Sequence, residues 1–138
     1  MIVVGFDTSP PSQHALAYAA GAAHRLRANL LVAHITSLTT MNCLTMMAPL
    51  CAGTTAEFQA DSIITAHAMA AEILDDTPVP WSFTARPGDA AIELARLADE
   101  HTADSIVVGR ASAWYHRLLG SVSTRLVQRA KCPVTVVP

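Results

Sequence analysis

Residues 105–138 read SIVVGRASAWYHRLLGSVSTRLVQRAKCPVTVVP. A β-branched run meets Gly109, as buried parallel strands often do where they leave a sheet. A loop follows to Gly120 and Ser121, after which apolar residues at near-helical spacing predict a helix. Residues 134–137 predict a final strand between two prolines. The stretch is therefore a strand–loop–helix–strand unit, and its helix begins at a Gly-Ser pair where unpaired N–H groups favour an anion.

The rest of the chain alternates short apolar runs with helical patterns. Strands are expected at 2–6, 30–35, 79–85 and 105–108, with helices between them. The segment 36–55 is rich in Thr and Met and shows no steady period, which predicts a long loop. Alternating strands and helices predict a doubly wound α/β parallel sheet with right-handed crossovers and helices on both faces. Because no linker or repeat divides the 138 residues, one domain covering residues 1–138 is expected.

Helical periodicity predicts which side chains pack on this sheet. Ser9 suits the cap of the first helix, and Asp89 suits the cap of the helix after the third strand. His34, inside the second strand, and His67, on an apolar helix face, are interpreted as core histidines rather than ligands. The residues expected to face the sheet are, for the four helices in chain order, Leu16, Ala19, Ala20, Ala23 and Leu26; Ala60, Ile63, Ile64, His67, Ala71 and Leu74; Ala91, Leu94, Ala95 and Ala98; and Val122, Leu126, Val127 and Ala130.

Composition excludes several classes of function. The net charge of −2 gives no bulk electrostatic attraction to nucleic acid. Lys131 is the sole lysine, so the lysine-dependent phosphate loop is absent. Three cysteines (Cys43, Cys51, Cys132) without Cys-x2-Cys spacing argue against a disulfide framework or a zinc site, and free thiols are expected. No catalytic constellation or metal-ligating histidine pair is visible, so an enzyme is not expected.

The chain also lacks the patterns of membrane and secreted proteins. The segment 28–56 contains no charged residue, but Asn29, His34 and Pro49 interrupt it, and no run of about eighteen apolar residues occurs. The chain begins directly in an apolar strand, without the charged region of a signal peptide. A cytoplasmic protein is therefore expected.

The order of Gly109, Gly120-Ser121 and the segment 131–134 (Lys-Cys-Pro-Val) resembles the universal stress protein family. Nucleotide-binding members of that family carry Gly-x2-Gly-x9-Gly-Ser/Thr between the fourth strand and the fourth helix, followed by a Cys-Pro-Val-type final strand. The resemblance extends over the whole chain and implies a Rossmann-like sheet of five parallel strands in the order 3-2-1-4-5. Two differences stand out: Ser112 replaces the second glycine, and seven residues instead of nine precede Gly120.

The resemblance also implies a binding site for an adenine nucleotide (ATP, AMP or cyclic AMP). Ligands of open sheets bind where the strand order reverses, here between the strands that end at Asp7 and Gly109. In the family, an aspartate at the first position contacts the nucleoside, and the glycines with a hydroxyl residue hold the phosphates. Asp7 could instead accept N–H groups of its own turn, and Ser121 could simply cap a helix. The candidate site comprises Asp7, Ile35, Val108, Gly109, Ser112, Gly120, Ser121 and Val122.

Two functions remain open. One is a stress-response binding or signalling protein with a weak adenine-nucleotide site, and the other is a nucleotide-free dimeric interaction module. An ATP-hydrolysing enzyme has less support, because no base or metal-ligating pair beyond Asp7 can be named. Residues 134–137 predict an apolar edge strand that needs cover. The resemblance implies a homodimer formed by antiparallel pairing of this strand with its mate.

Overall fold

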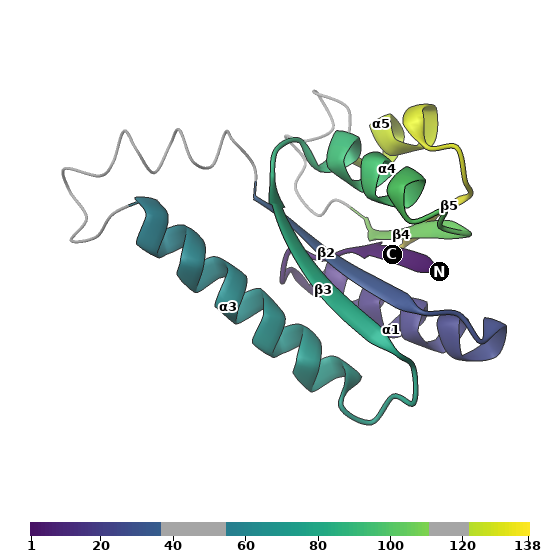
Figure 1. Ribbon diagram of the computed structural model, residues 1–138, viewed down its shortest axis with the longest axis horizontal. Coiled ribbons are helices and arrows are strands. Elements are labelled where there is room, and N and C mark those ends of the chain that lie inside the picture. Colours follow the sequence, from purple (N-terminus) through teal and green to yellow (C-terminus); the bar gives the residue numbers. More distant parts are fainter. Residues whose placement is uncertain (37–54, 111–121) are drawn as a thin grey trace.

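A computed structural model describes residues 1–36, 55–110 and 122–138, and Figure 1 shows their sheet between helices. All neighbouring strands pair in parallel, in the order β3-β2-β1-β4-β5. This confirms the predicted fold class and strand order. The third strand begins two residues later than predicted. The strands are β1 (Ile2–Gly5), β2 (Leu30–Thr36), β3 (Trp81–Pro87), β4 (Ser105–Gly109) and β5 (Val134–Val137).

Helices cover both faces of the sheet because successive strand residues point to opposite sides. Ile2 and Val4 belong to one core layer together with α1 (Pro10–Leu26) and α3 (Thr55–Leu74). Val3 belongs to the other layer, under α4 (Ala90–Glu100) and α5 (Val122–Arg129). In Figure 1, α1 and α3 lie on one side of the strands, and α4 and α5 lie on the other.

The buried faces of α1 and α4 largely follow the predicted stripes, whereas those of α3 and α5 do not. The α1 stripe is buried from Leu16 to Ala23, but Leu26 is 67% exposed, so its predicted burial is wrong. In α5 only Leu126 is buried among the described residues, whereas Val127 is exposed. In α3, Leu74 is buried as predicted, but the other buried residues are Ala66 and Ala70, and the predicted Ile64 is exposed, so most of the predicted face is wrong.

The two interpreted histidines differ in their surroundings. His34 is buried, and both of its ring nitrogens have hydrogen-bond partners, which confirms a core histidine. His67 is exposed, so the core interpretation is wrong for it. Its ring centroid lies 5.8 Å from that of Trp81 and 5.0 Å from that of Phe83, the latter in an edge-on arrangement. The imidazole covers two aromatic side chains of the β3 edge.

Helix α4 begins as predicted. The Asp89 carboxylate accepts a hydrogen bond of 3.1 Å from the Ile92 N–H, the usual geometry of an N-cap aspartate. Helix α1 differs, because Ser9 occupies the cap position but its side chain makes no capping bond. Across residues 1–36, 55–110 and 122–138, no helix combines the length and apolar character that crossing a membrane requires.

Candidate functional site

The carboxyl ends of β1 and β4 meet at the point where the strand order reverses. β1 lies between β2 and β4 in the sheet, so the connection after β1 leads to one side while β4 lies on the other. Ligands of open α/β sheets bind in the crevice at such a point. The ends of β1 and β4, with Asp7 and Gly109, therefore lie at the reversal of strand order, where a ligand site is predicted.

Asp7 follows β1 in a tight polar turn. Its Oδ1 accepts hydrogen bonds from the Ser9 N–H, at 3.1 Å, and from the Ser9 hydroxyl. The Asp7 N–H in turn donates to Ser12 Oγ at 3.3 Å. The local alternative considered for Asp7 is thus realised. Among the described residues both of these bonds to the carboxylate use Oδ1.

The ionisation of Asp7 follows from these contacts. Partial burial raises the pKa of Asp7, but the hydrogen bonds from Ser9, together with the nearby Ser12 hydroxyl, outweigh it and leave the pKa below its ordinary value. Asp7 is exposed, so the carboxylate is both ionised at neutral pH and accessible. It can accept hydrogen bonds from a polar ligand in the crevice.

The turn after Asp7 is held in an unusual backbone conformation. Thr8 has φ of 67°, in the left-handed region that β-branched residues rarely adopt. The Gln13 side-chain amide donates to the Thr8 carbonyl at 2.9 Å, and the Gln13 N–H donates to the Ser9 carbonyl at 3.0 Å. Strain of this kind persists only where surrounding contacts enforce it, and it is concentrated at functional sites.

Gly109 is required by close packing between β4 and the start of α1. A Cβ at this position would lie 2.5 Å from the carbonyl carbon of Pro11 and 2.7 Å from the Ser12 nitrogen. Side chains do not approach backbone this closely, so only glycine fits. Gly109 therefore has a structural role independent of any phosphate.

Ser12 connects the two sides of the crevice and was not singled out from the sequence. It is buried, its nitrogen faces Gly109, and its hydroxyl lies between the Asp7 N–H and the Ser9 carbonyl, to which it donates at 2.9 Å. Ser12 lies four residues before Leu16, so extending the buried stripe of α1 by one turn would have found it.

The remaining predicted site residues are only partly placed. Ile35 lies near the end of β2 and is half-buried, Val108 is buried in β4, and Val122 begins α5 and is exposed. The other three lie outside the described residues: Ser112, Gly120 and Ser121. The structure thus places Asp7, Val108 and Gly109 at the ends of the neighbouring strands β1 and β4 and does not test the predicted phosphate loop.

An ion pair joins α4 and α5. Arg125 Nη1 lies 2.8 Å from Asp89 Oδ2, while the other carboxylate oxygen caps α4. Desolvation raises the pKa of Asp89, but the hydrogen bonds from Arg125 and the Ile92 N–H outweigh it and leave the pKa lowered. Because α5 follows the predicted phosphate loop, this pair fixes the helix on which that loop ends.

The described residues show neither a reactive thiol nor a metal cluster. Cys132 is a half-buried free thiol whose pKa is raised by burial and by the charges of Asp99 and Asp104, which disfavours a reactive thiolate. Cys43 and Cys51 lie outside the described residues. Within the described ranges, no group of three or more His, Cys, Asp or Glu side chains could hold a metal ion.

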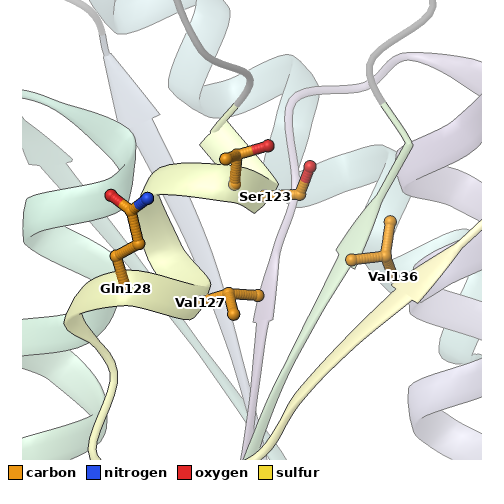
Figure 2. Close-up of a pocket in the computed structure, with 5 residues that line it drawn as sticks. Ser123, Val127, Gln128 and Val136 are labelled. Carbon is orange, nitrogen blue, oxygen red and sulfur yellow. The ribbon is translucent and has the colours of Figure 1, made fainter.

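A shallow groove lies between α5 and β5. Its volume is about 360 Å³, and it is lined by Ser123, Thr124, Val127, Gln128 and Val136. Figure 2 shows Val127 from the helix and Val136 from the strand on opposite sides of this groove. Both valines are exposed, at 60% and 41%. The lining residues do not include Asp7 or Gly109, and the two exposed valines supply the apolar part of this surface.

Comparisons with known proteins agree with this fold. The model of the universal stress protein family matches residues 1–138. No match was found among curated proteins. Among solved structures, a universal stress protein in complex with cAMP is 28% identical over 99% of this chain and 94% of its own, with a TM-score of 0.69.

Two further structures come from Archaeoglobus fulgidus. One is a universal stress protein in complex with dAMP, 20% identical over 99% of this chain and 96% of its own, with a TM-score of 0.71. The other is a universal stress protein that is 20% identical over 99% and 92% of the two chains, with a TM-score of 0.74. At this identity the likeness shows the fold alone. With the family model matching the full length, the chain belongs to the universal stress protein family.

Proposed function

We propose that this chain is a stress-response binding protein that takes an adenine nucleotide weakly in the crevice at the ends of β1 and β4. The observation that carries the proposal is the Asp7 turn. An ionised, accessible carboxylate is fixed at the switch point of the sheet by hydrogen bonds to its own turn. Nucleotide hydroxyl groups are suitable donors to such a carboxylate.

The hydrogen bonds of Asp7 are compatible with this role. Ser9 occupies Oδ1 of Asp7, so Oδ2 is the oxygen through which the described part of the site could accept a ribose hydroxyl. The structural relatives in complex with cAMP and dAMP support an adenine nucleotide as the ligand class. ATP and AMP belong to the same class.

Weak affinity follows from the sequence of the phosphate loop. Ser112 stands where nucleotide-binding members of the family carry glycine, and the loop is two residues shorter. We therefore expect fewer backbone N–H groups to be available for the phosphates. Each lost charge-assisted bond is worth about 1.5–3 kcal/mol, and about 1.4 kcal/mol is tenfold in affinity. Millimolar rather than micromolar dissociation constants are expected.

We also propose that the protein binds rather than hydrolyses its nucleotide. Hydrolysis requires a positioned base or a metal to activate water. Asp7 is the only candidate that the sequence names, and its lowered pKa makes it a weak base. A stress-linked signalling role through ligand occupancy fits this chemistry.

Calorimetry with ATP, AMP and cyclic AMP tests the proposal. Asp7→Asn keeps the oxygen that accepts from Ser9 but removes the charge, and we expect it to weaken binding by about tenfold. Asp76→Asn is the matched control, because Asp76 is an exposed aspartate that follows α3, at the opposite end of the sheet. Equal affinity of the wild type and Asp7→Asn would contradict the proposal.

A second function rests on a different observation. β5 lies at the edge of the sheet, and the exposed Val127 and Val136 form an apolar groove beside it. An uncovered apolar edge is an aggregation hazard, which pairing with a second copy would remove. We propose a homodimer through β5, which would serve as a nucleotide-free interaction module if the crevice were empty.

A further inference from the structure

His34 is the one buried titratable side chain among the described residues. It lies near the end of β2, on the face covered by α1 and α3, and is 6% exposed. Its Nδ1 is 2.9 Å from the carbonyl oxygen of Phe6, and its Nε2 is 3.3 Å from the hydroxyl of Ser62 in α3. The ring thus joins the end of β1 to α3.

These partners determine which nitrogen of His34 carries the proton. The carbonyl oxygen of Phe6 can only accept a hydrogen bond, so Nδ1 must be the donor. In a neutral imidazole the other nitrogen is then an acceptor. The Ser62 hydroxyl therefore donates to Nε2. The neutral Nδ1–H tautomer satisfies both contacts.

The hydrogen bond from His34 Nδ1 to the Phe6 carbonyl fixes the peptide bond between Phe6 and Asp7. Phe6 directly precedes Asp7, and the Phe6 N–H donates to the Ala33 carbonyl at 2.9 Å. Both backbone polar groups of Phe6 are therefore bound by consecutive residues of β2, Ala33 and His34. The ladder between β1 and β2 ends at the pair Gly5 and Ala33, so the side chain of His34 extends this attachment beyond it.

The turn downstream is held from the opposite side. Thr8, with its left-handed φ of 67°, has its carbonyl bound by Gln13 of α1. The segment Asp7–Thr8 is thus held at both ends: the His34 ring binds the carbonyl before it, and the Gln13 amide binds the Thr8 carbonyl. If the bond at Phe6 were lost, the strained turn could relax and the carboxylate would change its direction.

We propose that His34 is a positioning residue for the nucleotide site: its Nδ1–H fixes the peptide before Asp7 and, through Ser62, couples that peptide to α3. The effect on ligand binding rests on the proposed function. The effect on the geometry of the turn does not, and it can be measured without ligand.

Two substitutions separate the two ring nitrogens. The amide nitrogen of Asn lies about as far along the side chain as Nδ1, so His34→Asn retains a donor for Phe6. The amide of Gln lies at the distance of Nε2, so His34→Gln reaches toward Ser62 and loses that donor. We expect His34→Asn to keep AMP affinity within about twofold and His34→Gln to weaken it about tenfold.

Amide exchange supplies the ligand-free readout. The Ser9 N–H is bonded to Asp7 Oδ1, so its protection reports the geometry of the turn. We expect it to exchange about tenfold faster in His34→Gln than in the wild type, and at nearly the wild-type rate in His34→Asn. Equal increases in the Ser9 exchange rate in both variants would show that His34 acts only through packing and would overturn the proposal.

The role of His34 can be decided even if the proposed nucleotide site fails or a variant does not fold. If Asp7→Asn leaves AMP binding unchanged, the proposed nucleotide site fails, and the Ser9 exchange rates alone decide the role of His34. If His34→Gln does not fold, the nitrogen-15 spectrum of the wild-type imidazole decides it. A protonated Nδ1 with an unprotonated Nε2 supports the proposal, and a proton on Nε2 alone overturns it.

Discussion

The Asp7 crevice and the α5–β5 groove are built on different physical principles. At the crevice, polar groups are arranged by hydrogen bonds to one another, and a strained backbone is held in place by Gln13 and Ser12. At the groove, Val127 and Val136 are exposed apolar side chains beside the free edge of the sheet. The first region is polar and charged, and the second combines two exposed valines with the polar side chains of Ser123, Thr124 and Gln128.

This difference indicates what each region can bind. Fixed polar donors and acceptors recognise a small ligand, because their orientation is set before binding. An apolar surface next to unpaired strand groups suits another protein chain, since it offers both contact area and backbone hydrogen bonds. The two proposals therefore rest on different residues, and single substitutions can test each one.

The largest effect is expected where the crevice depends on packing. Gly109→Val places a side chain against the backbone of Pro11 and Ser12, and we expect a loss of about 3 kcal/mol in the free energy of unfolding. Denaturant unfolding measures it. Gly21→Ala is the control: Gly21 lies within α1, its new Cβ would meet only the flexible Arg25 side chain at 3.3 Å, and alanine favours helices by about 1 kcal/mol.

A valine tolerated at position 109 would show that α1 can move away from β4. The crevice would then be adaptable, and its contrast with the groove would weaken.

The next effect concerns assembly at the groove. Ile106 N–H donates to the Pro133 carbonyl and Arg110 N–H to the Val137 carbonyl, so alternate residues of β5 face β4 and Val136 presents its backbone to the free edge. Val136→Pro removes an outward N–H and leaves the β4 ladder intact. We expect the variant to sediment as a folded monomer while the wild type sediments as a dimer at micromolar concentration.

Thr135→Pro is the matched control. The N–H of residue 135 faces β4, so removing it should destabilise the fold itself. A wild type that sediments as a monomer, or a Val136→Pro variant that remains dimeric, would exclude the β5 interface.

A smaller effect is expected at the ion pair between α4 and α5. Asp89→Ala removes both the helix cap and the partner of Arg125, and we expect a loss of about 1 kcal/mol. Asp89→Asn keeps a capping oxygen and should lose less. Thermal unfolding of the two variants distinguishes them, and equal losses would show that the charge rather than the cap matters.

The stability that Asp89 contributes decreases at low pH. The pKa of Asp89 is lowered in the folded protein, so its contribution to stability is complete above the ordinary aspartate value of about 3.9 and is lost as the pH falls through the folded pKa. Asp89→Asn should therefore lose less stability than the wild type on acidification below about pH 4. A parallel decline in both proteins would contradict this.

The sequence was sufficient for the sheet but less so for the helix faces. β-branched runs and the glycine after the fourth strand, together with the family resemblance, gave the five parallel strands and their order, and Asp89 was correctly predicted as a cap. Leu26 and Val127 match a helical stripe but lie where the sheet no longer covers the helix, so they are exposed. Periodicity identifies a face and does not show where its cover ends.

The candidate site shows a similar division. Asp7 and Gly109 were found because strand ends are visible in a sequence. Ser12 was missed because the predicted stripe of α1 was not extended by one turn to include it. Its contact with Gly109 depends on how closely α1 approaches β4, a tertiary distance that local pattern does not contain. His67 was misjudged because the rings it covers, Trp81 and Phe83, belong to another element.

Chemical-shift mapping with AMP tests the nucleotide site most directly, because it reports on the crevice and the groove in one experiment. We expect the amide signals of Thr8, Ser9 and Gly109 to shift with increasing AMP, while those of Val127 and Val136 remain unchanged. Shifts confined to the groove, or none at all at millimolar AMP, would contradict a nucleotide site at Asp7.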